Sequence, residues 1–149
     1  MSEHDEACAF AVDMLLLNIP FYHLPNENPA GAKIVGHKEE KPIWGKNWGA
    51  IKRRQDEGIS KGLPDYLIII PAERSKYARQ LILFIELKLP PKRLKRKSPR
   101  GNKGDLVPQS EISQEQIDFI DLINKSADVS ASICHGFKQA TAFVKKYIK

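Results

Sequence analysis

Two apolar segments in the middle of the chain, residues 66–70 and 81–88, lack the alternation of polar and apolar positions expected for a strand with one exposed face. The first reads Tyr-Leu-Ile-Ile-Ile, and the second begins Leu-Ile-Leu-Phe-Ile before it ends in Glu86-Leu87-Lys88. Continuous apolar runs of this length are typical of strands buried on both faces. The ten residues between them can form a loop, so we predict that the two strands pair as a hairpin.

Helical spacing of apolar positions occurs in residues 4–17, 113–125 and 137–148. In the second of these segments, Ser113 and Gln116 have the spacing of a capping box, which marks the start of a helix. Its predicted apolar face comprises Ile117, Ile120, Leu122 and Ile123. The apolar face of the first segment comprises Ala7, Phe10, Ala11, Met14 and Leu17.

Weaker patterns predict the remaining elements. Residues 21–24 follow Pro20 as a short strand, residues 47–57 form a helix, and residues 128–134 form a last strand. Residues 89–110 contain four prolines and two glycines, which predicts a mobile loop. The predicted order is α, β, α, β, β, α, β, α. We therefore expect an α/β fold in which helices flank a mixed central sheet.

Composition narrows the class of protein. A chain of 149 residues with 42% hydrophobic residues suits one folded domain, which we place at 1–149. The two cysteines, Cys8 and Cys134, do not make a disulfide framework, so we expect an intracellular protein. The N-terminal segment does not resemble a secretory signal, and no apolar run approaches the length of a membrane span.

The positive charge is concentrated in one segment. Residues 92–103 contain seven lysines and arginines and no acidic residue, whereas the whole chain has a net charge of +6. Without this segment the net charge would be −1. The chain is thus a nearly neutral protein with one cationic segment, which begins four residues after Lys88.

Candidate chemistry lies where the two central strands meet. Glu86 and Lys88 share one face of their strand because side chains alternate, and Asp65 stands directly before the first strand. If the strands pair, two carboxylates and one lysine converge in a site suited to a hard divalent cation and to phosphodiester hydrolysis. The alternative is structural: an exposed Glu–Lys pair at a strand end and an aspartate in a turn.

Three motifs in order strengthen the first interpretation. They are Gly62-Leu-Pro-Asp65 before one strand, Glu86-Leu-Lys88 at the end of the next, and Ser113-Gln-Glu-Gln116 at a helix start. In this order they resemble the VRR-NUC (virus-type replication-repair nuclease) family of the PD-(D/E)XK superfamily. Pro25-Asn26-Glu27 resembles a short turn of that family, and the similarity extends over roughly residues 5 to 148.

The resemblance implies a role for each motif residue. Asp65 and Glu86 would bind the metal with help from the Leu87 backbone carbonyl, and Lys88 would be the catalytic lysine. The resemblance also assigns catalytic roles to Gln116 and to Glu6, the latter as an N-terminal acidic residue and a further metal ligand. Glu3 competes with Glu6 for that role. The structural alternative for Gln116 is capping of a helix start. For Glu6 it is a favourable charge in the first turn of a helix.

As a function, the resemblance implies a DNA endonuclease that depends on Mg²⁺ or Mn²⁺ and needs no organic cofactor. It further implies 5′-phosphate products, a homodimer, and branched substrates such as four-way junctions. The sequence departs from the family pattern in one respect. Twenty-four residues, a basic loop insertion at about 89–112, separate Lys88 from Ser113.

The basic segment has three interpretations: a solvated loop, a localisation signal, or a surface that binds DNA phosphates. Its position beside the predicted site favours the third. A non-catalytic nucleic-acid-binding module that uses residues 92–103 is the alternative to an enzyme. The predicted DNA-binding residues are Lys92, Arg93, Lys95, Arg96, Lys97, Arg100 and Lys103, extended by Lys52, Arg53 and Arg54 of the preceding helix.

Overall fold

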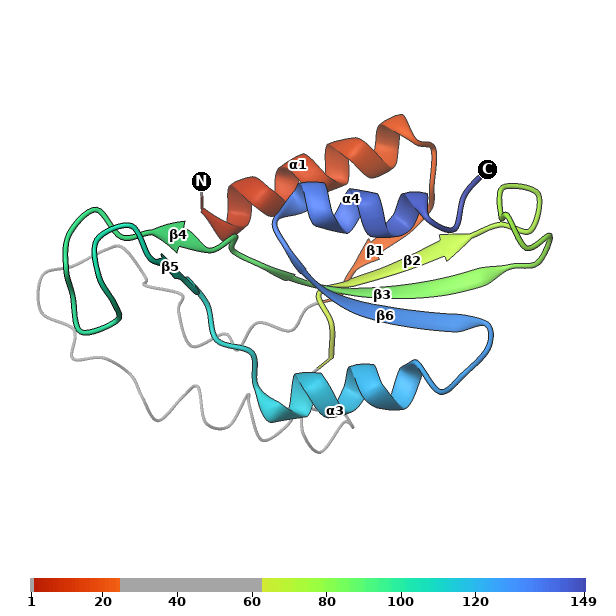
Figure 1. Ribbon diagram of the computed structural model, residues 1–149. Coiled ribbons are helices and arrows are strands. Elements are labelled where there is room, and N and C mark those ends of the chain that lie inside the picture. Colours follow the sequence, from red (N-terminus) through yellow and green to blue (C-terminus); the bar gives the residue numbers. More distant parts are fainter. Residues whose placement is uncertain (1, 25–62) are drawn as a thin grey trace, which may run out of the picture.

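A four-stranded mixed sheet forms the centre of the computed structural model, which describes residues 2–24 and 63–149 (Figure 1). Its strands lie in the order β1-β2-β3-β6. β1–β2 and β2–β3 are antiparallel pairs, and β3–β6 is a parallel pair. The strands are β1 (Phe21–His23), β2 (Tyr66–Ile70), β3 (Leu81–Lys88) and β6 (Val129–His135).

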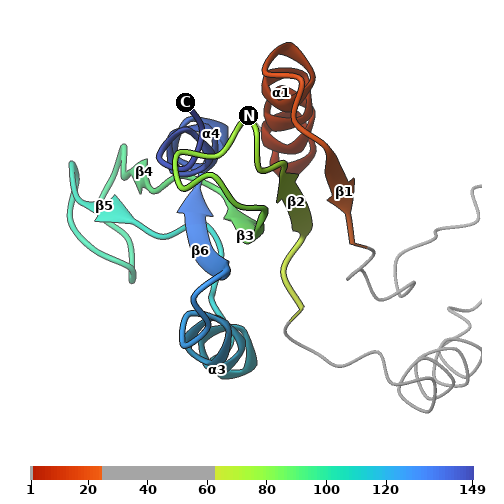
Figure 2. The same ribbon diagram turned by 90° about the vertical axis from the view of Figure 1, so that its right-hand side faces the viewer.

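Helices cover both faces of this sheet (Figure 2). α1 (Glu3–Leu16) and α4 (Phe137–Lys145) lie side by side on one face, and α3 (Gln114–Ile123) lies on the other. Because β3 and β6 are parallel, the chain has to cross the sheet between them, and α3 is part of that crossover. The prediction of a mixed central sheet flanked by helices is confirmed, as is the hairpin of β2 and β3.

The hydrophobic core lies between the sheet and the α1–α4 layer. Phe10 and Met14 of α1 are fully buried, as the helical spacing predicts. They pack with the odd-numbered apolar residues of β3 and with the even-numbered ones of β2. Phe10 meets the ring of Tyr66 edge to face at 5.0 Å between centroids, which ties α1 to the first residue of β2.

α1 ends in a Schellman motif rather than at the proline that follows it. Asn18 has a φ of 52°, a left-handed conformation that asparagine tolerates. The N–H of Ile19 donates to the Met14 carbonyl at 3.1 Å, and that of Asn18 donates to the Leu15 carbonyl at 3.0 Å. The turn directs the chain into β1 at the sheet edge.

The prediction that residues 89–110 are a loop needs correction, because short strands form within them. This segment forms a second, two-stranded antiparallel sheet of β4 (Lys92–Arg93) and β5 (Leu106–Val107). A bridge between Ser98 and Gly101 closes the hairpin near its tip. Pro99, Gly101 and Gly104 lie in or beside the tight turns of this hairpin, and the other prolines flank its strands.

Three smaller predictions need correction. The last helix ends at Lys145, and Ile148 instead pairs with Ser75 in the β2–β3 loop. Leu122 is 62% exposed, because α3 contacts the sheet through Phe119, whose ring lies 5.6 Å from that of Phe84. The last strand spans Val129–His135, one residue later than predicted.

Some predictions concern residues that the structure does not describe. The turn at Pro25-Asn26-Glu27 and the helix at 47–57, with Lys52, Arg53 and Arg54, lie outside the described residues. Within residues 2–24 and 63–149, no helix is long and apolar enough to cross a membrane.

Candidate functional site

The pairing of β2 with β3 brings Asp65 and Glu86 together. Tyr66 lies opposite Ile85, and both side chains are buried on the α1–α4 face. The next step of the same register places Asp65 opposite Glu86, and alternation turns both towards the face that carries α3. Directly opposed residues of an antiparallel pair have Cβ atoms about 4.5–5.5 Å apart. The two carboxylates therefore share one small region at the end of the sheet.

Proline at position 64 shapes this end of the ladder. In the β2–β3 register Pro64 is the residue opposite Leu87, and it has no N–H to offer the Leu87 carbonyl. The Leu87 N–H instead donates to Asp65 Oδ2 at 2.8 Å. The Pro-Asp sequence thus ends the regular ladder and anchors the Asp65 carboxylate on the backbone of β3.

Glu86 is the centre of the cluster. Its side chain is 4% exposed, and its Oε1 lies 2.7 Å from Lys88 Nζ. Gln116 Nε2 of α3 donates a hydrogen bond to the same oxygen. The other oxygen, Oε2, is buried and has no hydrogen-bond partner within the described part of the chain. A buried carboxylate oxygen without a donor is costly, so Oε2 is a candidate contact for a further ligand.

The pKa values of both carboxyls are raised. For Glu86, burial is the main cause, and the charge of Asp65 adds to it, while the hydrogen bond and charge of Lys88 oppose it. Burial also raises the pKa of Asp65, against the opposing effects of the Leu87 N–H and Lys88. Paired acids with pKa values shifted in this way cluster at functional sites.

These shifts predict how stability depends on pH. Because the folded pKa values are raised, the two carboxyls contribute stability that is full below their ordinary pKa values of about 4 and is lost as pH rises through the folded values. Urea denaturation over a pH series checks this. We expect the Asp65→Asn, Glu86→Gln double variant to lose less stability than the wild type as pH rises from about 4 to neutrality.

The control for this series is Asp121→Asn, which removes an exposed carboxyl on α3. It should follow the wild-type pH dependence. A double variant that also follows the wild type would show that the two carboxyls titrate as they do in the unfolded chain.

Glu6, to which the resemblance assigns an N-terminal acidic role, contacts the start of α4. Its side chain is buried at the start of α4, where Oε2 accepts the Phe137 N–H at 2.7 Å. Gly136 adopts a φ of 87°, and a Cβ there would come within 3.2 Å of the same oxygen. The Gly136 N–H in turn donates to the Lys88 carbonyl at 2.8 Å. Glu6 therefore connects α1, α4 and the end of β3 through the backbone.

Glu3, the competing acidic residue, acts on the site through its charge. It raises the pKa of Asp65, after the larger effects of burial, the Leu87 N–H, Lys88 and His23. His23 lowers the pKa of Asp65, and the sequence interpretation missed this residue. His23 is opposite Tyr66 at the end of β1, and only the pairing of this three-residue edge strand brings it near Asp65.

Gln116 caps the start of α3 and also contacts Glu86. Its side-chain Oε1 accepts the Ser113 N–H at 3.0 Å, and its backbone N–H donates to Ser113 Oγ at 3.3 Å, which completes the capping box. Its Nε2 remains free for Glu86. The helix start is thus oriented by the same side chain that reaches the carboxylate.

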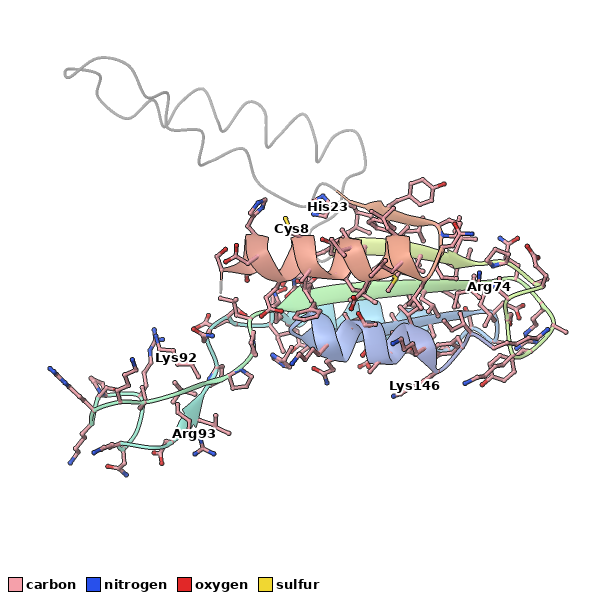
Figure 3. The ribbon with its side chains drawn as sticks, turned by 90° about the horizontal axis from the view of Figure 1, so that it is seen from above. Cys8, His23, Arg74, Lys92, Arg93 and Lys146 are labelled. Carbon is pink, nitrogen blue, oxygen red and sulfur yellow. The ribbon has the colours of Figure 1, made fainter. Side chains whose placement is uncertain are left out.

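The hairpin of β4, β5 and the residues between them (92–107) is called the cationic hairpin below. It begins beside this cluster and projects from the sheet, as Figure 3 shows for Lys92 and Arg93. All seven of its predicted DNA-binding residues are exposed: Lys92, Arg93, Lys95, Arg96, Lys97, Arg100 and Lys103.

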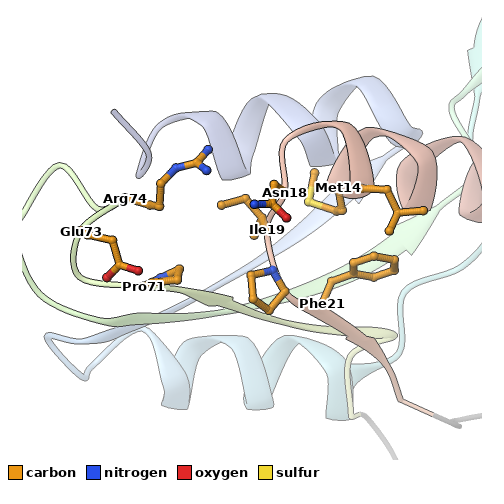
Figure 4. Close-up of a pocket in the computed structure, with 9 residues that line it drawn as sticks. Met14, Asn18, Ile19, Phe21, Pro71, Glu73 and Arg74 are labelled. Carbon is orange, nitrogen blue, oxygen red and sulfur yellow. The ribbon is translucent and has the colours of Figure 1, made fainter.

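A surface pocket of about 550 Å³ lies at the other end of β2, between the end of α1 and the β2–β3 loop (Figure 4). Ile19, Phe21 and Pro71 provide apolar walls, and Glu73 and Arg74 are its charged residues. Arg74 Nη2 already donates to the Leu17 carbonyl at 2.9 Å. No residue of the carboxylate cluster lines this pocket, so the two are separate.

The described residues contain no group of three or more histidine, cysteine, aspartate or glutamate side chains that could hold a metal ion. The candidate donor set is therefore the Asp65 and Glu86 carboxylates together with the Leu87 carbonyl.

Comparisons of this chain with models of protein families, with curated proteins and with solved structures found no match. Fold and site together define a mixed α/β protein with two carboxylates, a lysine and a glutamine clustered at one end of its central sheet.

Proposed function

We propose that this chain is a divalent-metal-dependent endonuclease that hydrolyses DNA phosphodiester bonds, as the resemblance to the VRR-NUC family implies. The observation that carries the proposal is Glu86. It is almost fully buried, lies next to Asp65, contacts Lys88 and Gln116 through one oxygen, and has a buried second oxygen without a partner. A core built only for stability does not need this arrangement, because an apolar side chain avoids the cost of burying the charge.

The chemistry of the donors suits Mg²⁺ or Mn²⁺. Both are hard cations that prefer carboxylate and carbonyl oxygens and keep several waters. Asp65, Glu86 and the Leu87 carbonyl would hold the ion. When bound, such an ion acidifies a coordinated water and polarises a phosphate oxygen.

The other residues have roles that follow from their contacts. Lys88 provides a positive charge that would orient a water molecule and stabilise the negative charge of the transition state. Gln116 holds the Glu86 carboxylate in one orientation, and α3 fixes Gln116 in turn through its capping box. Glu6 sets the position of the β3 end through Gly136 and belongs to the support of the site.

Two measurements on the full chain test the proposal. Purified protein is incubated with linear, flap and four-way-junction DNA in Mg²⁺, Mn²⁺ or EDTA, and its melting temperature is recorded in the same buffers. We expect cleavage in the metal buffers alone and a higher melting temperature in Mn²⁺, because a ligand that binds only the folded state stabilises it. At 100 times its dissociation constant, Mn²⁺ would add about 2.7 kcal/mol.

Asp65→Asn is the matched variant, since it keeps the size of the side chain and an oxygen that can accept the Leu87 N–H. We expect it to lose both the cleavage and the Mn²⁺-dependent rise in melting temperature. Cleavage that persists in EDTA or in Asp65→Asn would contradict the proposal.

A non-catalytic nucleic-acid-binding module is the second candidate. The ion pair of Lys88 with Glu86 favours it, because the two charges already compensate one another. In that case the protein would bind DNA without cleaving any of the three substrates, and Mn²⁺ would leave the melting temperature unchanged. Comparison of the three DNA shapes and of the molecular mass in solution also tests the expected preference for branched DNA and the expected homodimer.

A further inference from the structure

Hydrogen bonds hold the cationic hairpin together from its base to its tip. At its base, Gln109 Nε2 donates to the Pro90 carbonyl at 2.7 Å, and Lys92 pairs with Val107. Leu94 continues the ladder with Asp105 and Gly104 at 2.9 and 2.8 Å. Near the tip, Ser98 and Gly101 exchange two backbone hydrogen bonds at 3.0 and 3.1 Å. The tip itself is the dipeptide between them, a proline and an arginine.

The positive charge of this hairpin is not compensated by the described residues. Its one acidic residue between positions 89 and 110, Asp105, uses its carboxylate to accept the Asn102 N–H at 2.7 Å. Arg93 donates to the Gly104 carbonyl across the hairpin. Among the described residues, no ion pair neutralises any of the seven cations. Folding thus gathers seven positive charges on a narrow ribbon, which a polyanion would stabilise.

The shape and composition of the ribbon select a duplex. Two strands lie about 4.8 Å apart, so a hairpin with its side chains fits the major groove of B-DNA, which is about 12 Å wide. Residues 89–110 contain no aromatic side chain on which unpaired bases would stack. The narrow major groove of A-form RNA does not admit side chains in this way.

The hairpin is attached to the candidate site at both of its ends. The chain enters it four residues after Lys88, and leaves it for α3, whose Gln116 contacts Glu86. Figures 1 and 3 show the hairpin extending from this end of the sheet. A duplex that lies along the hairpin therefore has a path to the carboxylates.

We infer that the β4–β5 hairpin is a duplex-DNA docking arm that enters the major groove and holds the phosphate backbone beside Asp65 and Glu86. The inference rests on the proposed function for the reason why the DNA is brought to these carboxylates. Binding itself needs only the arm.

Binding is measured by fluorescence anisotropy on a short blunt DNA duplex in EDTA, between about 50 and 200 mM salt. For the wild type we expect a slope of log K against log salt of about −4 to −6, which corresponds to roughly four to seven phosphate contacts. Lys95, Arg96, Lys97 and Arg100 are replaced together by glutamine in the arm variant. We expect its slope to become shallower by about 3 to 4 and its affinity to fall about 100-fold.

The control replaces four exposed lysines elsewhere by glutamine, namely Lys125, Lys138, Lys145 and Lys146, so that both variants carry the same net charge. We expect it to bind like the wild type. Methyl green, a major-groove ligand, should displace the wild type from the duplex, whereas netropsin, a minor-groove ligand, should not.

The same binding assay is repeated with single-stranded DNA, with duplex RNA and with phosphatidylserine vesicles. The inference would be overturned if the control variant lost as much affinity as the arm variant, or if the wild type bound the single strand or the RNA more tightly than the DNA duplex. It would also be overturned if the arm variant were impaired only in binding the vesicles. Because the assay contains EDTA, it does not depend on cleavage. If the protein binds DNA through the arm but never cleaves it, the docking arm is supported and the proposed nuclease function is contradicted. If the arm variant cleaves as well as the wild type, the nuclease function is supported and the docking arm is contradicted.

Discussion

Lys88→Met removes metal-dependent DNA cleavage, with an expected fall in rate of about 10²–10³-fold, the usual effect of deleting one group that stabilises transition-state charge. Lys88 is the only cation within ion-pair distance of Glu86 among the described residues, and its side chain is 13% exposed. Methionine keeps much of its length but has no charge. The measurement is the initial rate of cleavage in Mg²⁺ on whichever of the three DNA substrates the wild type cleaves best.

The loss of rate has to be separated from a loss of structure. Removal of Lys88 leaves Glu86 buried without its partner, which costs about 3 kcal/mol or more. The Lys88→Met, Glu86→Gln double variant removes both charges and should regain that stability without regaining cleavage. Lys146→Met, at the exposed residue that follows α4, serves as the control for loss of a lysine. A Lys88→Met protein that cleaves at the wild-type rate would refute the catalytic role.

Glu6→Ala is expected to lower the free energy of unfolding by about 2–3 kcal/mol, because hydrogen bonds to charged groups contribute most and because a buried N–H is left without an acceptor. The Glu6 carboxylate accepts the Phe137 N–H at the start of α4, 131 residues away in the sequence. Its loss disconnects α1 from α4 near the Lys88 carbonyl. Urea denaturation at neutral pH measures the free energy of unfolding. A thermal melt should show a fall in melting temperature of several degrees.

Glu6→Gln distinguishes a cap from a metal ligand. The amide oxygen can still accept the Phe137 N–H, so we expect this variant to recover a good part of the lost stability and to keep its cleavage activity. Glu3→Ala should leave stability nearly unchanged, because Glu3 is exposed. If Glu6→Gln were as stable as the wild type but had lost cleavage, Glu6 would act in the site, as the resemblance implies, and not mainly as a cap.

The strength of the sequence signal explains which elements were predicted correctly. β2 and β3 are continuous apolar runs, and α1 repeats buried positions at Phe10 and Met14. Local patterns of this kind survive in any tertiary context, because the same residues must be removed from water. The cationic hairpin has no such pattern. Backbone hydrogen bonds and two tight turns hold it together, so its sequence resembled a loop.

The site divides in the same way. Asp65, Glu86 and Lys88 were named from residue type and order, and Gln116 from the resemblance, and the structure brings all four together. The position of Glu6 was not predictable, since its partner is the first N–H of a helix at the far end of the chain. The contribution of His23 depends on an edge strand of three residues.

The sequence by itself determined the two buried strands, the helices that pack on them, and the acids and lysine at their ends, because strand alternation and apolar burial act between neighbours in the chain. Tertiary structure decided the rest. It placed Asp65 against the Leu87 N–H, Gln116 against Glu86, and Glu6 at the start of α4. These contacts join residues 22 to 131 positions apart, and no local pattern encodes such pairs, since they exist only once the sheet and its helices have packed.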